Sequence, residues 1–544
     1  MRGLMMDGPL TLVSICERAR RYFPQVEVVS RRADGTLART TYSTLCRRAR
    51  QLAGALEREG LARGDRVATL QWNHAAHLEA YFGVPLAGGV VHPLNLRLHP
   101  DELAYIVNHA GDRFLLVDDV LLPVFERFRQ LTRFERFWVV PCSGAAAGPD
   151  EESYDALVAS ASDDFHYPDF DENDAAAMFY TSGTTGRPKG VVYSHRSLVL
   201  HALALGHADS FAISHRDTAL LVAPMFHANG WGMPHACALA GAKLVLLGTG
   251  ASPEDLLDLM MNEGVTLACG VPTIWLGLLD ALRRQPDRWK FPHSIRLPVG
   301  GAAPPESLIR EIDRYGLRIR HAWGMTETSP LGTICHLKTH MLDWPEDRQY
   351  RVRALQGYAV PLVELRLMRP EGEVAWDGVT PGELEVRGPW IASSYYHAPE
   401  ENDRWSADGW FRTGDVATID SEGFVKIVDR SKDLIKSGGE WISSVDLENA
   451  LMAHPAVREA AVVAVPHPKW QERPLAVVVL RPGASVECQD LQEFLAARFA
   501  RWQLPDAFVF AGEIPRTSVG KFLKSQLRER YSGVLVKPGP GEKK

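Results

Sequence analysis

Through the first two-thirds of the chain, amphipathic helical patterns alternate with short apolar runs. An apolar stripe at helical spacing predicts a helix capped by Ser43 and closed by Gly60. The stripe consists of Leu45, Ala49, Leu52, Ala53 and Leu56. Short buried strands are predicted at Val67–Leu70 and Phe114–Val117, and Pro100 opens a further helix between them. This alternation predicts a parallel sheet with helices on both faces.

From Pro361 onward the pattern changes to short strands separated by turns. Strands are predicted at Leu362–Met368, Gly382–Gly388 and Gly423–Val428. Short strands spaced in this way indicate a barrel-like β module.

The last part of the chain shows a third pattern, in which a strand at Ala460–Val465 lies between helices at Ser444–Met452 and Asp490–Phe499. These elements predict a small α+β unit of about 100 residues. The fold class is therefore α/β, with a large N-terminal domain of two α/β subdomains plus the β module, followed by a small α+β C-terminal domain. The predicted divisions are an N-terminal domain at 1–429, a hinge at 430–433, a C-terminal domain at 434–531 and a tail at 532–544.

Length and composition limit the possible functions. A chain of 544 residues is too long for one hydrophobic core, so two to four domains are expected. A net charge of −7 argues against a nucleic-acid partner. No apolar run approaches the ~20 residues that span a bilayer, and no secretory signal is expected at the start. Seven cysteines without a CxxC pair argue against a zinc site or a disulfide framework, so a cytoplasmic location is expected.

A loop rich in glycine and hydroxyl groups follows the apolar run Ala175–Tyr180 and extends over Thr181–Gly190. Its three glycines allow a close approach of the backbone to an anion, and its N–H groups can surround phosphate oxygens. The four hydroxyls add donors and Lys189 adds a positive charge. The spacing differs from a Walker A loop, and Pro188 disfavours a regular helix start. A phosphate-binding loop is the favoured interpretation, and a flexible surface loop is the alternative.

The string Tyr180–Gly190 resembles the signature of the acyl-adenylating superfamily, which includes acyl-CoA synthetases, adenylation domains of peptide synthetases and firefly-type luciferases. The remaining motifs follow in the order typical of that superfamily over nearly the whole chain. The resemblance implies that the loop binds ATP, and that the small domain is mobile. The loop residues assigned to the nucleotide are Thr181, Ser182, Gly183, Thr184, Thr185, Gly186 and Lys189.

Two further motifs resemble the adenine-binding and metal-binding parts of the family. The first is the turn Gly300-Gly301-Ala302-Ala303, in which Gly301 and Ala302 are assigned to the nucleotide. In the second, relatives usually carry tyrosine where Trp323 stands, so stacking on adenine is expected without a phenolic hydroxyl. Glu327 is the implied Mg²⁺ ligand, with Thr181 near the same ion. The other nucleotide-binding residues of the second motif are His321, Ala322, Gly324 and Thr326.

The C-terminal third supplies the remaining implied nucleotide contacts. Asp415 resembles the ribose-binding carboxylate, and Arg430 would contact ribose or phosphate. Lys521 matches the lysine that reaches the α-phosphate and the attacking carboxylate, where it would stabilise developing charge. The small domain would swing about Lys432. Lys436 and Trp441 would face the nucleotide or the thiol channel.

The segment around His227 matches the part of the family that lines the acyl pocket. Amino-acid-activating relatives tend to carry aspartate where His227 stands, so a free amino acid is disfavoured. His227 is also assigned a catalytic role, with Lys521 and Glu327. Trp231 resembles the indole that gates the acyl tunnel of bacterial fatty acyl-CoA synthetases, and a core aromatic is the alternative. The pocket residues are His227, Ala228, Gly230, Trp231 and Gly300.

The resemblance implies an ATP-dependent acid–CoA ligase that forms an acyl-adenylate and passes the acyl group to CoA, with Mg²⁺ as the metal. Within the superfamily, the chain most resembles bacterial medium- and long-chain fatty acyl-CoA synthetases. Because one methylene is worth only about 1–3 kcal/mol of discrimination, overlapping preferences for chain length are expected. A ligase for a short methylthio-propionate-like acid or an aryl acid is the first alternative. A catalytically silent nucleotide-binding scaffold is the second. A homodimer is expected from the family alone.

Overall fold

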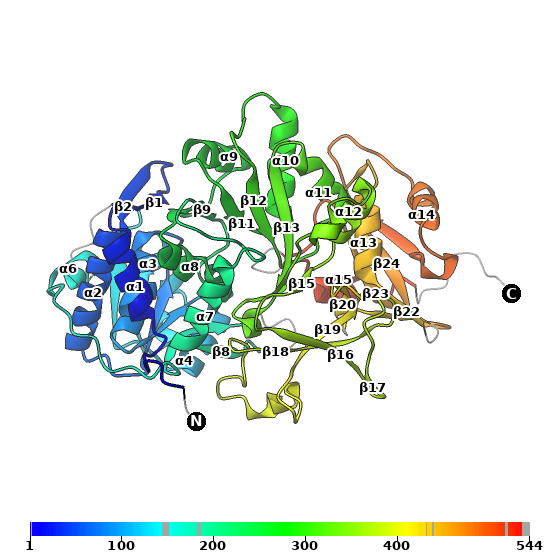
Figure 1. Cartoon of the computed structure of the whole chain (residues 1–544). Coiled ribbons are helices and arrows are strands. Elements are labelled where there is room, and N and C mark those ends of the chain that lie inside the picture. The colour runs from blue at the N-terminus through cyan, green and yellow to red at the C-terminus, as the bar shows by residue number, and fades with distance from the viewer. Residues whose placement is uncertain are drawn as a thin grey trace.

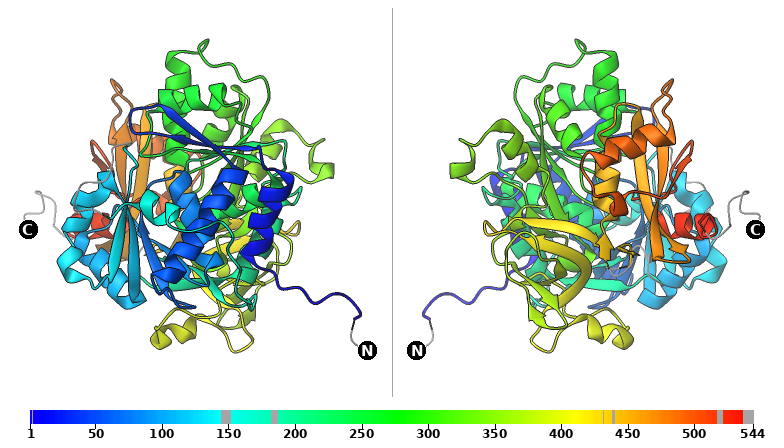
Figure 2. Two further views of the ribbon diagram at one scale, coloured as in Figure 1. Left: turned by 90° about the vertical axis from the view of Figure 1, so that its left-hand side faces the viewer. Right: turned by 90° about the vertical axis from the view of Figure 1, so that its right-hand side faces the viewer.

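The structure of the chain is a computed structural model that describes residues 1–544 except 2, 144–151, 182–186, 431, 438–439, 517–520 and 536–544. Its described elements form four sheets with helices packed on them, and the small C-terminal domain lies beside the β module and α11 (Glu306–Asp313) and α12 (Glu346–Arg353) (Figure 1). The first residues extend away from the body (Figure 2). Within the described part of the chain, none of the helices combines the length and apolar character needed to cross a bilayer.

The first sheet confirms the predicted parallel arrangement with helices on both faces. Phe114 and Leu116 face the core beneath helices α2 and α3, whereas Leu115 and Val117 belong to the core with α4. The strands in spatial order are β6 (Arg136–Val140), β5 (Asp112–Asp118), β3 (Arg66–Leu70), β4 (Val90–Pro93), β7 (Ala175–Tyr180) and the antiparallel β8 (Gly190–Ser194). Its helices are α2 (Tyr42–Arg58), α3 (Ala75–Leu86), α4 (Pro100–Ala110), α5 (Leu122–Glu126) and α6 (Tyr154–Ala159).

The start of α2 differs from the prediction. Thr41, and not Ser43, is the N-cap, because its side chain accepts a hydrogen bond from the Thr44 backbone N–H at 3.4 Å. Gly60, which was predicted to close the helix, follows Arg58 in a left-handed conformation with φ 85°.

The second sheet is mixed and contains nine strands. In spatial order they are β15 (Tyr358–Ala359), β14 (Leu331–Ile334), β13 (Leu317–Gly324), β12 (Ile295–Val299), β11 (Leu267–Cys269), β9 (Thr218–Leu221), β10 (Lys243–Leu246), β1 (Glu27–Arg31) and β2 (Leu37–Thr41). The other helices of this half are α1 (Leu12–Tyr22), α7 (His195–Gly206), α8 (Met233–Ala240), α9 (Pro253–Asn262) and α10 (Pro272–Arg284). The parallel pairing of β12 with β13 ends at Val299 and His321, and this brings Gly300 and Trp323 to the same edge.

The β module is a five-stranded antiparallel sheet. Its strands are β17 (Gly372–Glu373), β16 (Glu364–Arg369), β18 (Gly382–Arg387), β19 (Phe411–Ile419) and β20 (Val425–Arg430). Asp415 of β19 pairs with Arg430 of β20 in the sheet register, so two predicted site residues lie opposite each other.

The small domain packs its sheet between two helical layers. Val462 faces the core with α13 (Ser444–Met452) and α14 (Cys488–Ala496), while Val463 faces the core with α15 (Lys524–Tyr531). Its strands are β22 (Glu440–Ile442), β21 (Ile435–Ser437), β24 (Gln471–Leu480), β23 (Val457–His467) and β25 (Ala507–Phe510). Helix α14 begins before the predicted start at Asp490, because Glu487 forms its N-terminal capping box, and it ends at Ala496, before the predicted end at Phe499. The exact domain limits remain a prediction.

Candidate active site

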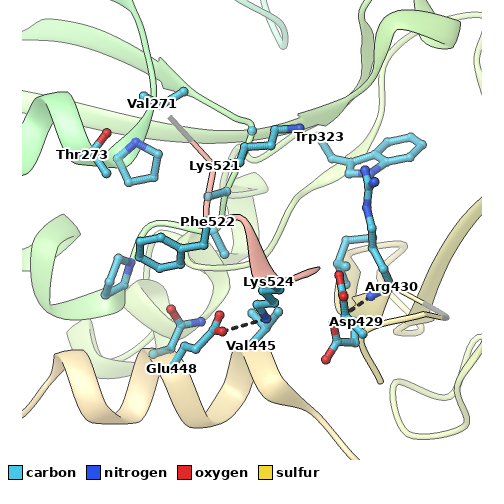
Figure 3. Close-up of a pocket in the computed structure, with 18 of the residues that line it drawn as sticks. Val271, Thr273, Trp323, Asp429, Arg430, Val445, Glu448, Lys521, Phe522 and Lys524 are labelled. Atoms are coloured by element: carbon cyan, nitrogen blue, oxygen red, sulfur yellow. Dashed lines mark hydrogen bonds and ion pairs between the residues drawn. The ribbon is translucent and has the colours of Figure 1, made fainter. Parts of the chain in front are cut away.

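Two adjoining cavities lie where the large domain, the β module and the small domain meet. The first, the inter-domain cavity, has a volume of about 260 Å³ and includes Asp415. Val271 and Thr273 line it together with α13 and the start of α15 (Figure 3). The second, the His227 cavity, has a volume of about 370 Å³ and includes His227 and Glu327. The residues common to both walls are Gly301, Ala322, Trp323, Gly324, Arg430, Lys432 and Lys521.

The phosphate loop connects two antiparallel strands of the first sheet. β7 ends at Tyr180 and β8 begins at Gly190, so the loop opens no helix, as the sequence indicated. At its base the Thr181 N–H donates to the Lys189 carbonyl at 2.9 Å, and the Lys189 N–H donates to Thr181 Oγ1 at 3.1 Å. Lys189 Nζ lies 2.5 Å from Glu401 Oε2. The predicted phosphate contacts Ser182, Gly183, Thr184, Thr185 and Gly186 lie outside the described residues.

Glu327, the predicted metal ligand, is buried at the wall of the His227 cavity. The Tyr395 hydroxyl donates to Glu327 Oε1 at 2.5 Å, and the Ala392 N–H donates to the Glu327 carbonyl at 2.8 Å. Lys189 Nζ lies 5.2 Å from the centre of the Tyr395 ring. Sequence reasoning missed Tyr395, and its only signal was a pair of aromatic residues in the β module. Thr181 lines the same cavity, so the two hard oxygen donors that could hold Mg²⁺ face one space.

The predicted ribose ligand Asp415 is 4% exposed and is held from two sides. Trp323 Nε1 donates to Asp415 Oδ2 at 2.8 Å, and Arg430 Nε lies 3.2 Å from Asp415 Oδ1. Trp323 therefore has a polar partner, Asp415, that the sequence did not predict. The sequence predicted only that its ring face would stack on adenine.

Lys521 comes from the small domain and lies at the junction of the two cavities. The position of a Cβ added to Gly301 would be 3.4 Å from Lys521 Cε, so the absence of a side chain there leaves room for the lysine. Burial and the Arg430 guanidinium lower the pKa of Lys521 to about 8, against the opposite effect of Asp415 and Glu327. Lys521 thus lines both the cavity that contains Asp415 and the cavity that contains His227.

The acyl-pocket segment forms a left-handed turn, Ala228–Gly232, just after His227. Its non-glycine residues Ala228, Asn229 and Trp231 all have positive φ, at 42°, 62° and 57°. Such backbone conformations are strained in L-residues and occur mainly at functional sites. The turn places the Trp231 ring against Gly300, where an added Cβ would lie 2.9 Å from Trp231 Cη2.

His227 is half-buried beside this turn. Burial and the positive charge of Lys521 lower the pKa of His227 to about 3, so the imidazole is neutral at physiological pH. The apolar part of the His227 cavity is formed by Phe211, Ala228, Trp231, Met325, Pro330 and Leu331. A neutral donor or acceptor beside apolar walls suits the carboxyl end of an acid with an apolar body.

Three predicted site residues are not among the described residues that line the two cavities. Gly230 is buried under the turn, where an added Cβ would meet Pro234 and Leu221 at 3.3 and 3.4 Å. Lys436 and Trp441 lie on the β21–β22 hairpin and are exposed, Trp441 by 48%. The Lys436 N–H donates to Glu472 at 2.9 Å. In this orientation of the small domain, the side chains of Lys436 and Trp441 face solvent and not the two cavities.

The predicted residues that the structure brings together do line the cavities. In the His227 cavity these are Thr181, Lys189, His227, Ala228, Trp231, Gly300, Thr326 and Glu327. In the inter-domain cavity they are Ala302, His321 and Asp415. The other described ones line both cavities, and these are Gly301, Ala322, Trp323, Gly324, Arg430, Lys432 and Lys521. Residues that sequence reasoning missed include Glu401 and Arg404 of the β module and Val271–Thr273 after β11.

A buried polar network fixes the small domain in this orientation. Ser444, at the start of α13, donates from its N–H and its hydroxyl to Asp429 Oδ2 of β20, at 2.8 and 2.5 Å. Lys524 Nζ donates to Ser444 Oγ at 2.6 Å. It also lies 2.7 Å from Glu448 Oε1 (Figure 3). Because Asp429 precedes the predicted hinge and Ser444 follows it, these bonds join the two domains. Burial raises the pKa of Glu448 to about 7, although Lys524 opposes this effect.

The arrangement of charges suits a nucleotide with a chain of phosphates. Among the residues that the structure describes, five cations line the His227 cavity, where Glu327 offers carboxylate oxygens, and Asp415 offers carboxylate oxygens in the inter-domain cavity. The cations are Lys189, Arg404, Arg430, Lys432 and Lys521. Arg430, Lys432 and Lys521 line both cavities, and a fixed set of positive groups shared by two adjoining spaces can hold two reactants and stabilise charge that develops between them.

The chain belongs to the AMP-binding enzyme family. The family of AMP-binding enzymes matches residues 16–396, and the AMP-binding enzyme C-terminal domain matches residues 446–521.

Among its relatives, the chain is 51% identical to a long-chain-fatty-acid–CoA ligase from Thermus thermophilus, over 97% of this chain and 96% of that one. It is 45% identical to a 3-methylmercaptopropionyl-CoA ligase from Ruegeria lacuscaerulensis, over 98% of this chain and 100% of that one. Among solved structures, ATP-bound MatB from Rhodopseudomonas palustris superposes with a TM-score of 0.82 at 29% identity, covering 96% of this chain and 100% of MatB.

Proposed function

We propose that this chain is an AMP-forming acid–CoA ligase whose substrate is a medium- or long-chain fatty acid. The observation that carries the proposal is the position of Lys521 at the junction of the two cavities, between Asp415 on the nucleoside side and His227 on the acid side. In this position one positive charge can reach both an α-phosphate and a carboxylate that attacks it.

The proposed reaction has two steps. A carboxylate oxygen of the acid attacks the α-phosphorus of ATP, and the bond to the β-phosphate breaks to release pyrophosphate. The CoA sulfur then attacks the acyl carbon, the acyl–oxygen bond breaks to release AMP, and the thiol proton passes to solvent. Asp415 orients the ribose, Lys189 and Arg430 hold phosphate oxygens, and Lys521 stabilises the charge on the reacting phosphate.

Mg²⁺ fits the donors present, because Glu327 and Thr181 offer hard oxygens at the phosphate side of the His227 cavity. When bound, the ion would neutralise charge on the phosphates. For the second step, the small domain would turn about Lys432 and withdraw Lys521. The exposed hairpin with Lys436 and Trp441 would then be free to face the thiol of CoA.

The preference for a fatty acid is supported by the walls of the acid side. Phe211, Trp231 and Leu331 give this side an apolar surface, and neutral His227 provides no charge to hold an amino or second carboxyl group. The 51% identity to the long-chain-fatty-acid–CoA ligase favours the same class. A ligase for a short sulfur-containing acid is the second candidate, favoured by the 45% identity to the 3-methylmercaptopropionyl-CoA ligase. Aryl-acid ligation and a catalytically silent nucleotide-binding scaffold are the remaining alternatives.

The test is CoA-thioester formation across acids from acetate to palmitate, with 3-methylthiopropionate and benzoate included, together with ATP–pyrophosphate exchange for each acid. We expect the highest kcat/KM for chains of medium or greater length. A maximum at 3-methylthiopropionate or benzoate would support the alternative ligases. The absence of exchange with every acid would favour the silent scaffold. A homodimer and a cytoplasmic location are proposed with this function, and sedimentation and cell fractionation test them.

A further inference from the structure

Trp323 and Asp415 are joined by a hydrogen bond that links two separate sheets. Trp323 lies near the end of β13 in the nine-stranded sheet, and Asp415 lies in β19 of the β module, 92 residues later. The indole N–H donates to Asp415 Oδ2 at 2.8 Å, and both residues are buried, Trp323 at 8% and Asp415 at 4% exposure. A charge-assisted bond at this distance in a buried setting is among the stronger hydrogen bonds in proteins.

Asp415 has a second anchor on its other oxygen. Arg430 Nε lies 3.2 Å from Asp415 Oδ1, and Arg430 stands on the same side of the inter-domain cavity as Trp323 (Figure 3). The backbone is fixed as well, because the Asp415 N–H donates to Thr413 Oγ1 at 3.0 Å. A carboxylate has about four acceptor positions, so two remain for a ligand in the cavity that Asp415 lines.

The identity of the aromatic residue decides whether the first anchor exists. The indole N–H lies on the edge of the ring system, whereas the tyrosine hydroxyl extends from the tip of a six-membered ring and phenylalanine has no donor. At position 323, tyrosine or phenylalanine would keep an aromatic face for stacking. Neither ring carries a donor at the edge from which Trp323 reaches Asp415.

We propose that Trp323 is a positioning residue for ribose recognition. Its indole N–H holds one oxygen of Asp415, and the carboxylate is thereby oriented to accept hydrogen bonds from the ribose hydroxyls of the adenine nucleotide. This proposal rests on the proposed function only in that the inter-domain cavity binds an adenine nucleotide. It assigns Trp323 a role in selecting ribose over deoxyribose, separate from stacking on the base.

The test measures binding, so that it does not depend on catalysis. The affinities for AMP, 2′-deoxy-AMP and 3′-deoxy-AMP are measured by titration calorimetry for the wild-type chain and for Trp323→Phe, Trp323→Tyr and Asp415→Asn. We expect the wild type to prefer AMP over both deoxy forms. In Trp323→Phe and Trp323→Tyr, AMP affinity should fall about tenfold, the effect of losing one hydrogen bond to a charged group. Affinity for the deoxynucleotide should fall much less, so the preference for ribose should approach that of Asp415→Asn.

Trp289→Phe is the matched control. Trp289 is also buried, at 3% exposure, and its Nε1 donates to Asp258 Oδ1 at 2.7 Å, but it lines neither cavity among the described residues. Its loss should lower the free energy of unfolding by a similar amount and leave the ribose preference unchanged. Comparing thermal unfolding of both variants separates a loss of stability from a loss of positioning.

Two results would overturn the proposal. If the Trp323 variants bind AMP and the deoxynucleotides more weakly by the same factor, Trp323 acts through stacking alone. If Asp415→Asn keeps the full ribose preference, Asp415 does not read the ribose and Trp323 has nothing to position. A failure of the proposed function has a different signature, since wild-type protein would then select AMP over deoxy-AMP without any ATP–pyrophosphate exchange.

Discussion

The hydroxyl of Tyr395 donates a 2.5 Å hydrogen bond to Oε1 of Glu327, and this contact joins the β-module side of the site to the predicted metal ligand. Burial and the negative charge of Glu327 raise the pKa of Tyr395, so the hydroxyl remains a donor throughout the accessible pH range. Since a donor occupies Oε1, the carboxylate is held in one orientation with Oε2 available for another partner. Partners of this kind orient metal ligands and tune their affinity.

Tyr395→Phe should therefore raise the Mg²⁺ concentration required for half-maximal ATP–pyrophosphate exchange by about tenfold. Glu327→Gln should raise it further, because the charge itself is lost. Tyr42→Phe is the control, since the Tyr42 hydroxyl donates to the Ala242 carbonyl at 2.8 Å and lines neither cavity among the described residues. An unchanged Mg²⁺ dependence in both site variants would remove Glu327 from the metal site.

Lys521→Ala should separate the two half-reactions. Adenylation should fall by roughly 10²–10³-fold, the usual effect of removing one charge-stabilising group. Thioester formation from supplied acyl-adenylate should be largely retained, because Lys521 is proposed to leave the site before that step. Both rates are measured by single-turnover assays. If the two half-reactions fall together, the role assigned to Lys521 is wrong.

The pH profile of adenylation follows from the lowered pKa of Lys521. The lysine stabilises negative charge only when it is protonated, and its pKa in the free protein is about 8. The kcat/KM for ATP–pyrophosphate exchange should therefore fall as the pH rises through about 8. In Lys521→Arg this decline should disappear, since guanidinium remains protonated. A wild-type profile that stays flat from pH 7 to 10 would contradict the prediction.

Trp231→Ala should change the acyl-chain profile. The ring packs on Gly300, and its removal enlarges the apolar end of the His227 cavity. The kcat/KM for longer or branched acids should rise relative to that for shorter acids. The change in this ratio should correspond to about 1–3 kcal/mol for each methylene that the enlarged cavity accommodates. The readout is the acid panel, with thermal unfolding to monitor stability. A lower stability with an unaltered profile would make Trp231 a packing residue.

Ser444→Ala should weaken the orientation in which Lys521 reaches the site. It removes the hydroxyl bonds to Asp429 and Lys524 but keeps the backbone N–H bond. Adenylation should slow several-fold, on the order of 1 kcal/mol for a lost buried hydrogen bond, while thioester formation should be unaffected or faster. Ser532→Ala is the control, because its hydroxyl bonds locally to the Glu529 carbonyl. Equal slowing of both half-reactions would argue against a role in orientation.

Much of the fold and most of the site could be predicted from local sequence. The residues Thr181, Lys189, Gly301, Glu327, Asp415 and Lys521 stand in short motifs whose residue types indicate their chemistry, and all six line the two cavities. The predicted ends of the helices were less accurate. Helix α2 is capped by Thr41 and not by Ser43, because β2 extends to Thr41 and the helix begins directly after it.

Tertiary structure decided the contacts between distant segments. The bonds from Tyr395 to Glu327 and from Trp323 to Asp415 span 68 and 92 residues, and no local pattern specifies them. The left-handed turn after His227 buries Gly230 and turns Trp231 toward Gly300, although Gly230 and Trp231 are adjacent in sequence. The orientation of the small domain places Lys521 in the site and leaves Trp441 exposed. The sequence by itself determined which side chains are candidates for the chemistry, because that depends on residue type. Which of them meet depended on how separately folded sheets pack against one another.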